Sequence, residues 1–198
     1  MTARRALFPL LAAALLAAAA APLAAQSPDD QAAMEAMARA ATPGPMHAFW
    51  ASHAGKWKVH TRMWMQPGTE PLESDATAEM AMILGGRYVQ EIFHGQTPMG
   101  PFEGRMLMGY DNTTGVVTAV WIDDMSTAVS VLTGKGCEPG KPLELSGSYV
   151  DPVTGQKLGI RTVTTYKDAD HYHFDYYMQP PGEKEFLSMA MEYERVTE

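Results

Sequence analysis

From residue 56 onward the sequence consists of short runs in which apolar and polar residues alternate, separated by turn residues. In such a run every second side chain points to the same side, which is typical of β-strands with one buried face. Residues 111–115 and 151–155 both read Asp-x-x-x-Gly, where Asp opens a tight turn and Gly takes the left-handed position. No helix-length segment separates the runs, so parallel βαβ units are not expected. This feature limits the chain to an antiparallel all-β fold.

The runs predict about ten strands in sequence, and a sheet of that size must protect its edges. Closing the sheet removes both edges, and an up-and-down barrel needs only hairpin connections such as these. A two-sheet sandwich is the main alternative, but sandwiches use longer crossing connections. The expected strands are 56–66, 73–82, 86–94, 102–110, 115–123, 126–133, 142–150, 157–167, 170–179 and 185–195.

The first 25 residues have the pattern of a secretory signal peptide. Arg4 and Arg5 precede an apolar run over residues 6–21, and small residues follow at 23–25. We expect cleavage before Gln26 and a protein that is periplasmic or secreted. The apolar run is short for a membrane span.

Residues 26–45 are expected to form an N-terminal helix and a linker, and residues 46–198 the barrel domain. Ser27 can cap the helix, Pro28 suits its first position, and the sequence Pro43-Gly-Pro45 ends it. The apolar segment 46–54 is expected to add a helical turn that caps the barrel.

Charge and cysteine content exclude several classes of protein. The net charge is −8 without a Lys/Arg cluster, which argues against nucleic acid as a partner. The single cysteine, Cys137, cannot form an internal disulfide, so the fold must depend on its core, and the role of the thiol stays open. A membrane-embedded barrel is disfavoured by the N-terminal helix and the non-aromatic C-terminus, so no membrane insertion of the mature chain is expected. The oligomeric state is not predicted.

A barrel of this size can enclose a small ligand, and the sequence supplies an apolar lining for it. Methionines two residues apart recur within the expected strands, and such pairs share a face. Methionine adapts to irregular shapes, although it also fills ordinary cores. Arg87 and Glu91 share a face and would be expensive inside a barrel unless they serve as polar anchors. The candidate ligand-binding residues are Trp57, Arg87, Glu91, Met106, Met108, Tyr110, Trp121, Met189 and Met191.

The main alternative is a metal or haem protein that uses His171 and His173, two residues apart on one strand. The intervening Tyr172 and the following Phe174 favour the interior, which places both histidines on the outer face. Thioether sulfurs also suit Cu(I), so copper is a second candidate. The primary prediction includes no metal and no cofactor.

Enzymatic activity has less support in the sequence than ligand binding. The chain has no Gly-x-Ser-x-Gly, no phosphate-binding glycine loop and no His-Glu-x-x-His. An enzyme that acts on a bound lipid or small ester would use Glu91 or Asp123 as its base. Catalytic residues are therefore left unassigned.

Six short motifs follow one another along the chain, namely His53-Ala-Gly-Lys-Trp57, Leu84-Gly-Gly-Arg87, Gly100-Pro-Phe-Glu-Gly104, Gly109-Tyr-Asp111, Trp121-Ile-Asp123 and Tyr193-Glu-Arg195. Taken together, they resemble the bacterial domain of unknown function 1579. The resemblance covers roughly residues 45–195 and implies a lipocalin-like or calycin-like β-barrel, with no established activity. A looser resemblance to nitrobindin-like haem barrels implies His171 or His173 as axial ligand, but the glycine-rich signature of that group after the first tryptophan is missing here.

Overall fold

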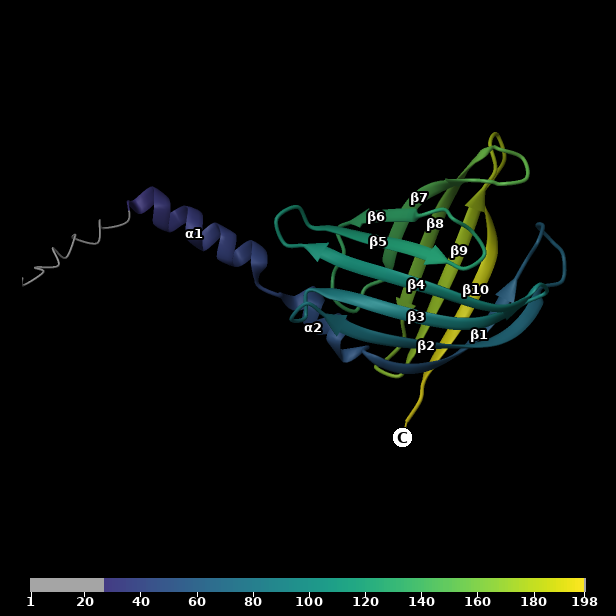
Figure 1. Cartoon of the computed structure of the whole chain (residues 1–198), viewed down its shortest axis with the longest axis horizontal. Helices are drawn as coiled ribbons and strands as arrows, with labels where there is room; N and C mark the ends of the chain where they lie inside the picture. The colour runs from purple at the N-terminus through teal and green to yellow at the C-terminus, as the bar shows by residue number, and fades with distance from the viewer. Residues whose placement is uncertain (1–26, 198) are drawn as a thin grey trace, which may run out of the picture.

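The computed structural model describes residues 27–197 and shows a closed antiparallel barrel of ten strands (Figure 1). Each strand pairs with the next along the chain, and β1 pairs with β10 to close the sheet. The predicted up-and-down barrel is therefore confirmed, whereas the predicted signal peptide lies outside the described residues. The strands are β1 (Gly55–Met63), β2 (Leu72–Ile83), β3 (Tyr88–Thr97), β4 (Gly100–Asp111), β5 (Val116–Asp123), β6 (Ser130–Lys135), β7 (Leu143–Val150), β8 (Lys157–Tyr166), β9 (His171–Gln179) and β10 (Phe186–Arg195).

Two helices precede the barrel. In α1 (Pro28–Ala41), Ser27 caps the N-terminus and forms a capping box with Asp30. This helix has no buried residue and extends away from the barrel (Figure 1). Its C-terminal end is held by the Asn112 side chain, which donates to the Thr42 carbonyl over 2.7 Å. None of the helices within residues 27–197 is long and apolar enough to cross a membrane.

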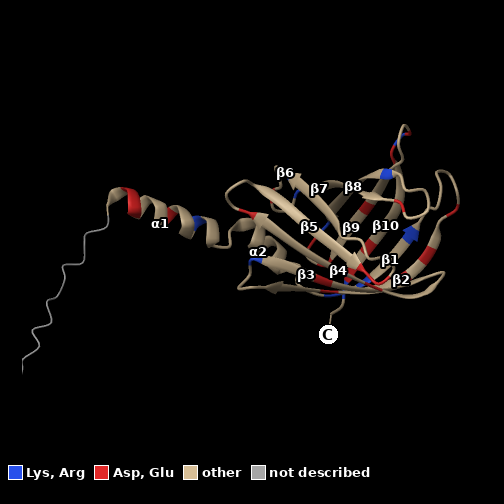
Figure 2. Ribbon diagram, turned by 45° about the horizontal axis from the view of Figure 1, so that its top comes forward, with Lys and Arg blue, Asp and Glu red and all other residues tan. Residues whose placement is uncertain are grey.

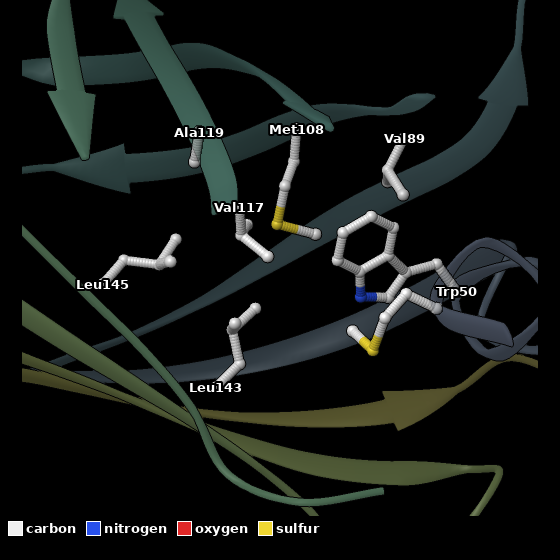
Figure 3. Close-up of a cluster of buried hydrophobic side chains, with 8 residues drawn as sticks. Trp50, Val89, Met108, Val117, Ala119, Leu143 and Leu145 are labelled. Atoms are coloured by element: carbon white, nitrogen blue, oxygen red, sulfur yellow. The ribbon is translucent and has the colours of Figure 1, made fainter. Parts of the chain in front are cut away.

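The second helix, α2 (Pro45–Ser52), covers one end of the barrel. Its apolar face buries Met46 and Trp50 in a cluster with residues of β3, β4, β5 and β7. Figure 3 shows the Trp50 indole reaching from α2 into this cluster beside Val89 and Met108. Burial of this face explains why so short a helix is stable, because isolated helices of this length are marginal in water.

Alternation along the strands decides which side chains enter the barrel. On β1, Trp57, Val59 and Thr61 are buried, whereas the residues between them are exposed. A similar alternation of buried and partly exposed residues places Val89, Glu91 and Phe93 of β3 inside. The inward set is mostly apolar, so the interior holds the hydrophobic core of the protein.

Charged residues occur on α1 and along the strands (Figure 2). Several of them pair across neighbouring strands. Arg161 of β8 contacts Glu185 over 2.6 Å and Glu144 of β7 over 3.3 Å. Exposed pairs of this kind add little stability, and their main effect is to keep the outer surface polar.

The inward side chains differ in how deeply they are buried. Toward α2, Trp57 and Val117 are both 0% exposed, whereas Met82 and Tyr110 are partly exposed. Toward the opposite end, inward residues of four strands pack against the second core cluster and yet remain partly exposed. Solvent therefore reaches part of the inner face at the end opposite α2. These partly exposed residues are Phe102, Trp121, Phe174 and Met189.

One glycine of the sequence motifs is explained by packing at this open end. Gly104 faces inward on β4, and a Cβ atom added there would collide with the Trp121 indole. Trp121 stacks on Phe102 with ring centroids 6.2 Å apart. Glycine at this position therefore makes room for the aromatic pair.

Arg195 joins the last strand to the α2 end. Its guanidinium donates to the carbonyls of Ser52 and Ala54 over 2.8 and 2.7 Å, and to Asp170 over 2.8 Å. It also lies over the Trp57 ring, 4.4 Å from its centroid. A single side chain thus ties α2, β1, β10 and the turn after β8 together.

We expect Arg195→Gln to lower the free energy of unfolding by about 2 kcal/mol, because hydrogen bonds from a charged group are lost together with the contact over Trp57. Urea unfolding followed by tryptophan fluorescence measures the change. Arg105→Gln is the matched control, since Arg105 is exposed and pairs with the partly exposed Glu103 over 2.7 Å. An equal decrease in the free energy of unfolding in both variants would contradict the role of Arg195 in holding these elements together.

Candidate functional site

A buried carboxyl group, Glu91, lies at the centre of the candidate site. It sits on the inward face of β3 between Val89 and Phe93 and is 5% exposed. Tyr193 reaches across from β10 and donates its hydroxyl to Glu91 Oε1 over 3.3 Å. Burial raises the pKa of Glu91 from 4.5 to about 7, and the bond from Tyr193 opposes this only in part. Glu91 therefore changes its charge near neutral pH.

Three tyrosines surround this carboxyl group. The rings of Tyr172 and Tyr193 stack with centroids 4.1 Å apart, and Tyr166 packs against Tyr172 at 5.8 Å. Burial raises the pKa of all three hydroxyls, which therefore remain protonated donors. Tyr172 donates to the Met80 sulfur over 3.8 Å.

Three buried polar atoms among residues 27–197 lack a hydrogen bond of ordinary geometry, although the Trp50 N–H interacts with the Tyr166 hydroxyl. Two can donate, namely Trp50 Nε1 and Thr61 Oγ1, and both side chains point into the interior. The third is His53 Nε2. Its other ring nitrogen, Nδ1, faces the Phe49 carbonyl at 2.9 Å and so donates to it. Buried polar groups normally find partners, so these three mark places that a ligand or water would satisfy.

Eight of the nine predicted site residues face the interior. Trp57, Met108 and Met191 are buried within the two core clusters, and Glu91 lies beside them. The remaining four pack against the clusters and are partly exposed, as expected of a lining that solvent reaches. These four are Met106, Tyr110, Trp121 and Met189.

Arg87 is the exception. The expected strand begins at residue 86, whereas β3 begins at Tyr88 and Arg87 lies in the preceding turn. Its guanidinium bonds the Leu84 carbonyl of that turn over 3.1 Å and is exposed. The expected pair of Arg87 and Glu91 on one face of a strand is therefore wrong. Glu91 is buried, and no cation within residues 27–197 pairs with it.

Arg87 instead borders a groove of about 390 Å³ on the outside of the barrel. The groove lies between the residues that join α1 to α2 and the ends of β3, β4 and β5. Tyr110 also reaches it, and its ring contacts His47 edge-on at 6.1 Å. Burial lowers the pKa of His47, whose Nδ1 accepts from the Gly44 backbone, so this histidine has a capping role.

The two candidate metal ligands lie on the outer face of β9. His171 is exposed and contacts Asp168 at 2.9 Å. His173 lies between Glu192 at 2.8 Å and Asp175 at 2.7 Å, so both of its ring nitrogens are engaged. The residues do not fit a haem inside the barrel, because neither imidazole faces the interior. Within residues 27–197 no group of three or more His, Cys, Asp or Glu side chains is arranged to hold a metal ion.

Asp123, the alternative candidate for a base, has a structural role. One carboxylate oxygen accepts the Trp121 Nε1 hydrogen over 2.9 Å. The other accepts the backbone N–H groups of Met125 and Ser126 over 3.1 and 3.0 Å. Its lone pairs are used to fix Trp121 and the turn after β5.

Sequence reasoning misses the polar groups that complete the site. Tyr172 and Tyr193 fall in expected strands, yet nothing in their spacing shows that their rings stack across neighbouring strands. Trp50 lies in the segment expected to cap the barrel, but its sequence position does not show that its N–H meets the Tyr166 hydroxyl. The alternation of Val89, Glu91 and Phe93 is the available signal for an inward Glu91.

Comparison with known proteins agrees with this fold. The family model described as "Protein of unknown function (DUF1579)" matches residues 42–195. Among solved structures, the chain resembles the crystal structure of Rv2717c from M. tuberculosis, with a TM-score of 0.60 and 15% sequence identity over 79% of this chain and 100% of that one. At this identity the likeness shows the fold alone. No curated protein matches the sequence. Since the family model spans the whole barrel, the chain belongs to the DUF1579 family.

Proposed function

We propose that this protein is exported and binds a small, largely apolar molecule inside its barrel. The observation that carries the proposal is a set of inward-facing apolar side chains that solvent reaches at the end opposite α2. Side chains such as Phe174 and Met189 point into the barrel toward that end and stay partly exposed. The open end would admit the ligand, and α2 closes the other.

The chemistry of the interior supports the same proposal. Methionine and aromatic side chains line the barrel, and Met80 and Met106 flank Glu91 on the neighbouring strands. Binding sites for small molecules are typically apolar with a few well-placed polar groups. Here the polar groups are Glu91 and the tyrosines around it. Export is supported by the signal-peptide pattern of residues 1–25.

The neutral fluorescent probe N-phenyl-1-naphthylamine tests binding directly. We expect its fluorescence to rise on titration with the protein and to saturate at one site. Ala76→Phe should weaken probe binding at least about tenfold, because Ala76 faces inward near the open end and lies beside Phe102 in the same cluster.

Ala81→Phe is the matched control, since Ala81 lies on the same strand but points outward and is exposed. It should bind the probe like the unmodified protein. No fluorescence gain with the unmodified protein, or equal effects of the two substitutions, would contradict an interior site. Native mass spectrometry of protein recovered from the periplasm of an expression host then shows any molecule that co-purifies and whether the chain begins at Gln26.

A further inference from the structure

The helix α1 carries an apolar stripe that it does not bury against the barrel. Apolar residues recur along it at intervals of three and four, so they share one face of the helix. None of the 14 residues of α1 is buried, and Met37 is 72% exposed. Isolated helices of this length are marginal in water, so α1 requires a surface to pack against. The stripe consists of Met34, Met37, Ala38 and Ala41.

A second apolar surface lies on the outside of β4, β5 and β6. Leu107, Val120 and Val131 are paired across these strands and form a row that points away from the interior. Leu107 and Val131 are 43% and 47% exposed, and Ile122, the next outward residue on β5, is 45% exposed. We call these four residues the outer apolar face. The groove of about 390 Å³ is part of it, because Leu107 and Val120 line that groove.

The connection to α2 holds α1 away from the outer apolar face of its own chain. The Asn112 amide lies 2.7 to 3.3 Å from three carbonyls at the C-terminal end of α1. Pro43 and Pro45 follow this end, and proline restricts the backbone. The helix therefore leaves the barrel in a direction that these contacts set (Figure 1). The surface that α1 requires must then belong to another molecule.

We propose that two copies of this chain form a dimer in which α1 of each copy packs on the outer apolar face of the other. A two-fold axis makes the two contacts equivalent, so both stripes and both faces are covered at once. The dimensions agree with this arrangement. A helix of 14 residues is about 21 Å long, and the four strands β3 to β6 span about 14 Å. The contact lies outside the barrel and is separate from ligand binding within it.

The charges of the two surfaces are complementary, which favours a second copy as the occupant. The helix has three acidic residues and one arginine, and hence a net charge of −2. On the barrel, the exposed Arg87 lines the groove, and the exposed Lys135 is paired with Val116, which lines it too. The carboxylate of Asp111 is engaged within its own turn by Thr113 and Thr114. A chain with a net charge of −8 thus presents cations where its own acidic helix would dock.

Sedimentation velocity of the whole mature chain over a range of concentrations tests the proposal. We expect a dimer, and we expect Met37→Glu and Leu107→Glu each to raise its dissociation constant at least about tenfold, because each places a carboxylate in an apolar contact. Both residues are exposed within one chain, so neither substitution should disturb the barrel, which circular dichroism verifies.

Met99→Glu is the matched control. Met99 is 80% exposed in the turn between β3 and β4, at the other end of these strands from the groove. It makes the same change of side chain and of charge as Met37→Glu, and it should dimerise like the unmodified protein.

Mixing the two variants shows which surfaces meet. In a mixed dimer of Met37→Glu and Leu107→Glu, the unmodified helix of one chain packs on the unmodified face of the other, so one of the two contacts is intact. Affinity-tagged Met37→Glu should therefore retain untagged Leu107→Glu but not untagged Met37→Glu.

Three results would overturn the proposal. The first is an unmodified chain that stays monomeric at every concentration. The second is a dimer that only one of the two substitutions dissociates, since the helix and the outer apolar face would then not meet. The third is an equal effect of the Met99→Glu control. None of them alters the proposed binding inside the barrel, which the fluorescent probe tests independently.

Discussion

Replacing Trp57 with alanine is expected to lower the free energy of unfolding by about 4 kcal/mol, because a large buried side chain is removed from the core. The indole is 0% exposed and packs edge-on against Tyr172. Its Nε1 donates to the His53 carbonyl over 3.2 Å, and Arg195 covers its face. Alanine would leave a cavity where β1, β9, β10 and the end of α2 meet. Urea unfolding monitored by far-ultraviolet circular dichroism measures the change.

Trp64→Ala provides the comparison, because Trp64 lies just beyond β1 and is partly exposed. The Arg62 guanidinium lies over its ring, 5.8 Å from the centroid. We expect the free energy of unfolding of this variant to fall by about 1 kcal/mol or less. An equally small decrease in the free energy of unfolding of Trp57→Ala would contradict the prediction. It would mean that the surrounding strands move in to fill the cavity, although a closed sheet with fixed register resists such movement. Trp57→Phe should fall between the two, since it keeps a ring but not the N–H.

The strands could be predicted well because their signals are local. Alternating burial and Asp-x-x-x-Gly turns depend on neighbouring residues, and the strand expected at 157–167 is observed as Lys157–Tyr166. The turn before β3 shows the limit of such reasoning. Leu84, Gly85 and Gly86 all adopt positive φ values, which moves the start of the strand to Tyr88 and leaves Arg87 outside it. One error in a boundary thus removed one of the two proposed anchors.

The site could be predicted only in part because it is assembled across the barrel. The sequence places Glu91 on a strand and leaves its direction open, since both faces of β3 carry apolar residues. Tyr193 lies 102 residues from Glu91 along the chain, and no local pattern indicates that they meet. The same holds for Trp50, whose packing depends on four different strands. Local periodicity indicates which side chains point inward, but not which of them touch.

Glu91 is a polar group held at a cost to stability. Because folding raises its pKa from 4.5 to about 7, the native state binds more protons than the unfolded state between these values. The contribution of Glu91 to the free energy of unfolding is therefore fully present below about pH 4.5 and is lost as the pH rises through 7. Such a cost is typical of a residue retained for function rather than for folding.

Glu91→Gln is accordingly expected to remove a pH dependence of about 2 to 3 kcal/mol between pH 5 and pH 8. At pH 8 the variant should be more stable than the unmodified protein, because an ionised carboxylate no longer has to be buried; at pH 5 the two should be similar. Urea unfolding at both pH values, with Glu79→Gln as the exposed control, isolates the contribution of Glu91 from that of the histidines. If Glu91→Gln lowers stability equally at both values, the hydrogen bond from Tyr193 matters more than the burial of charge, and Glu91 would be a structural residue.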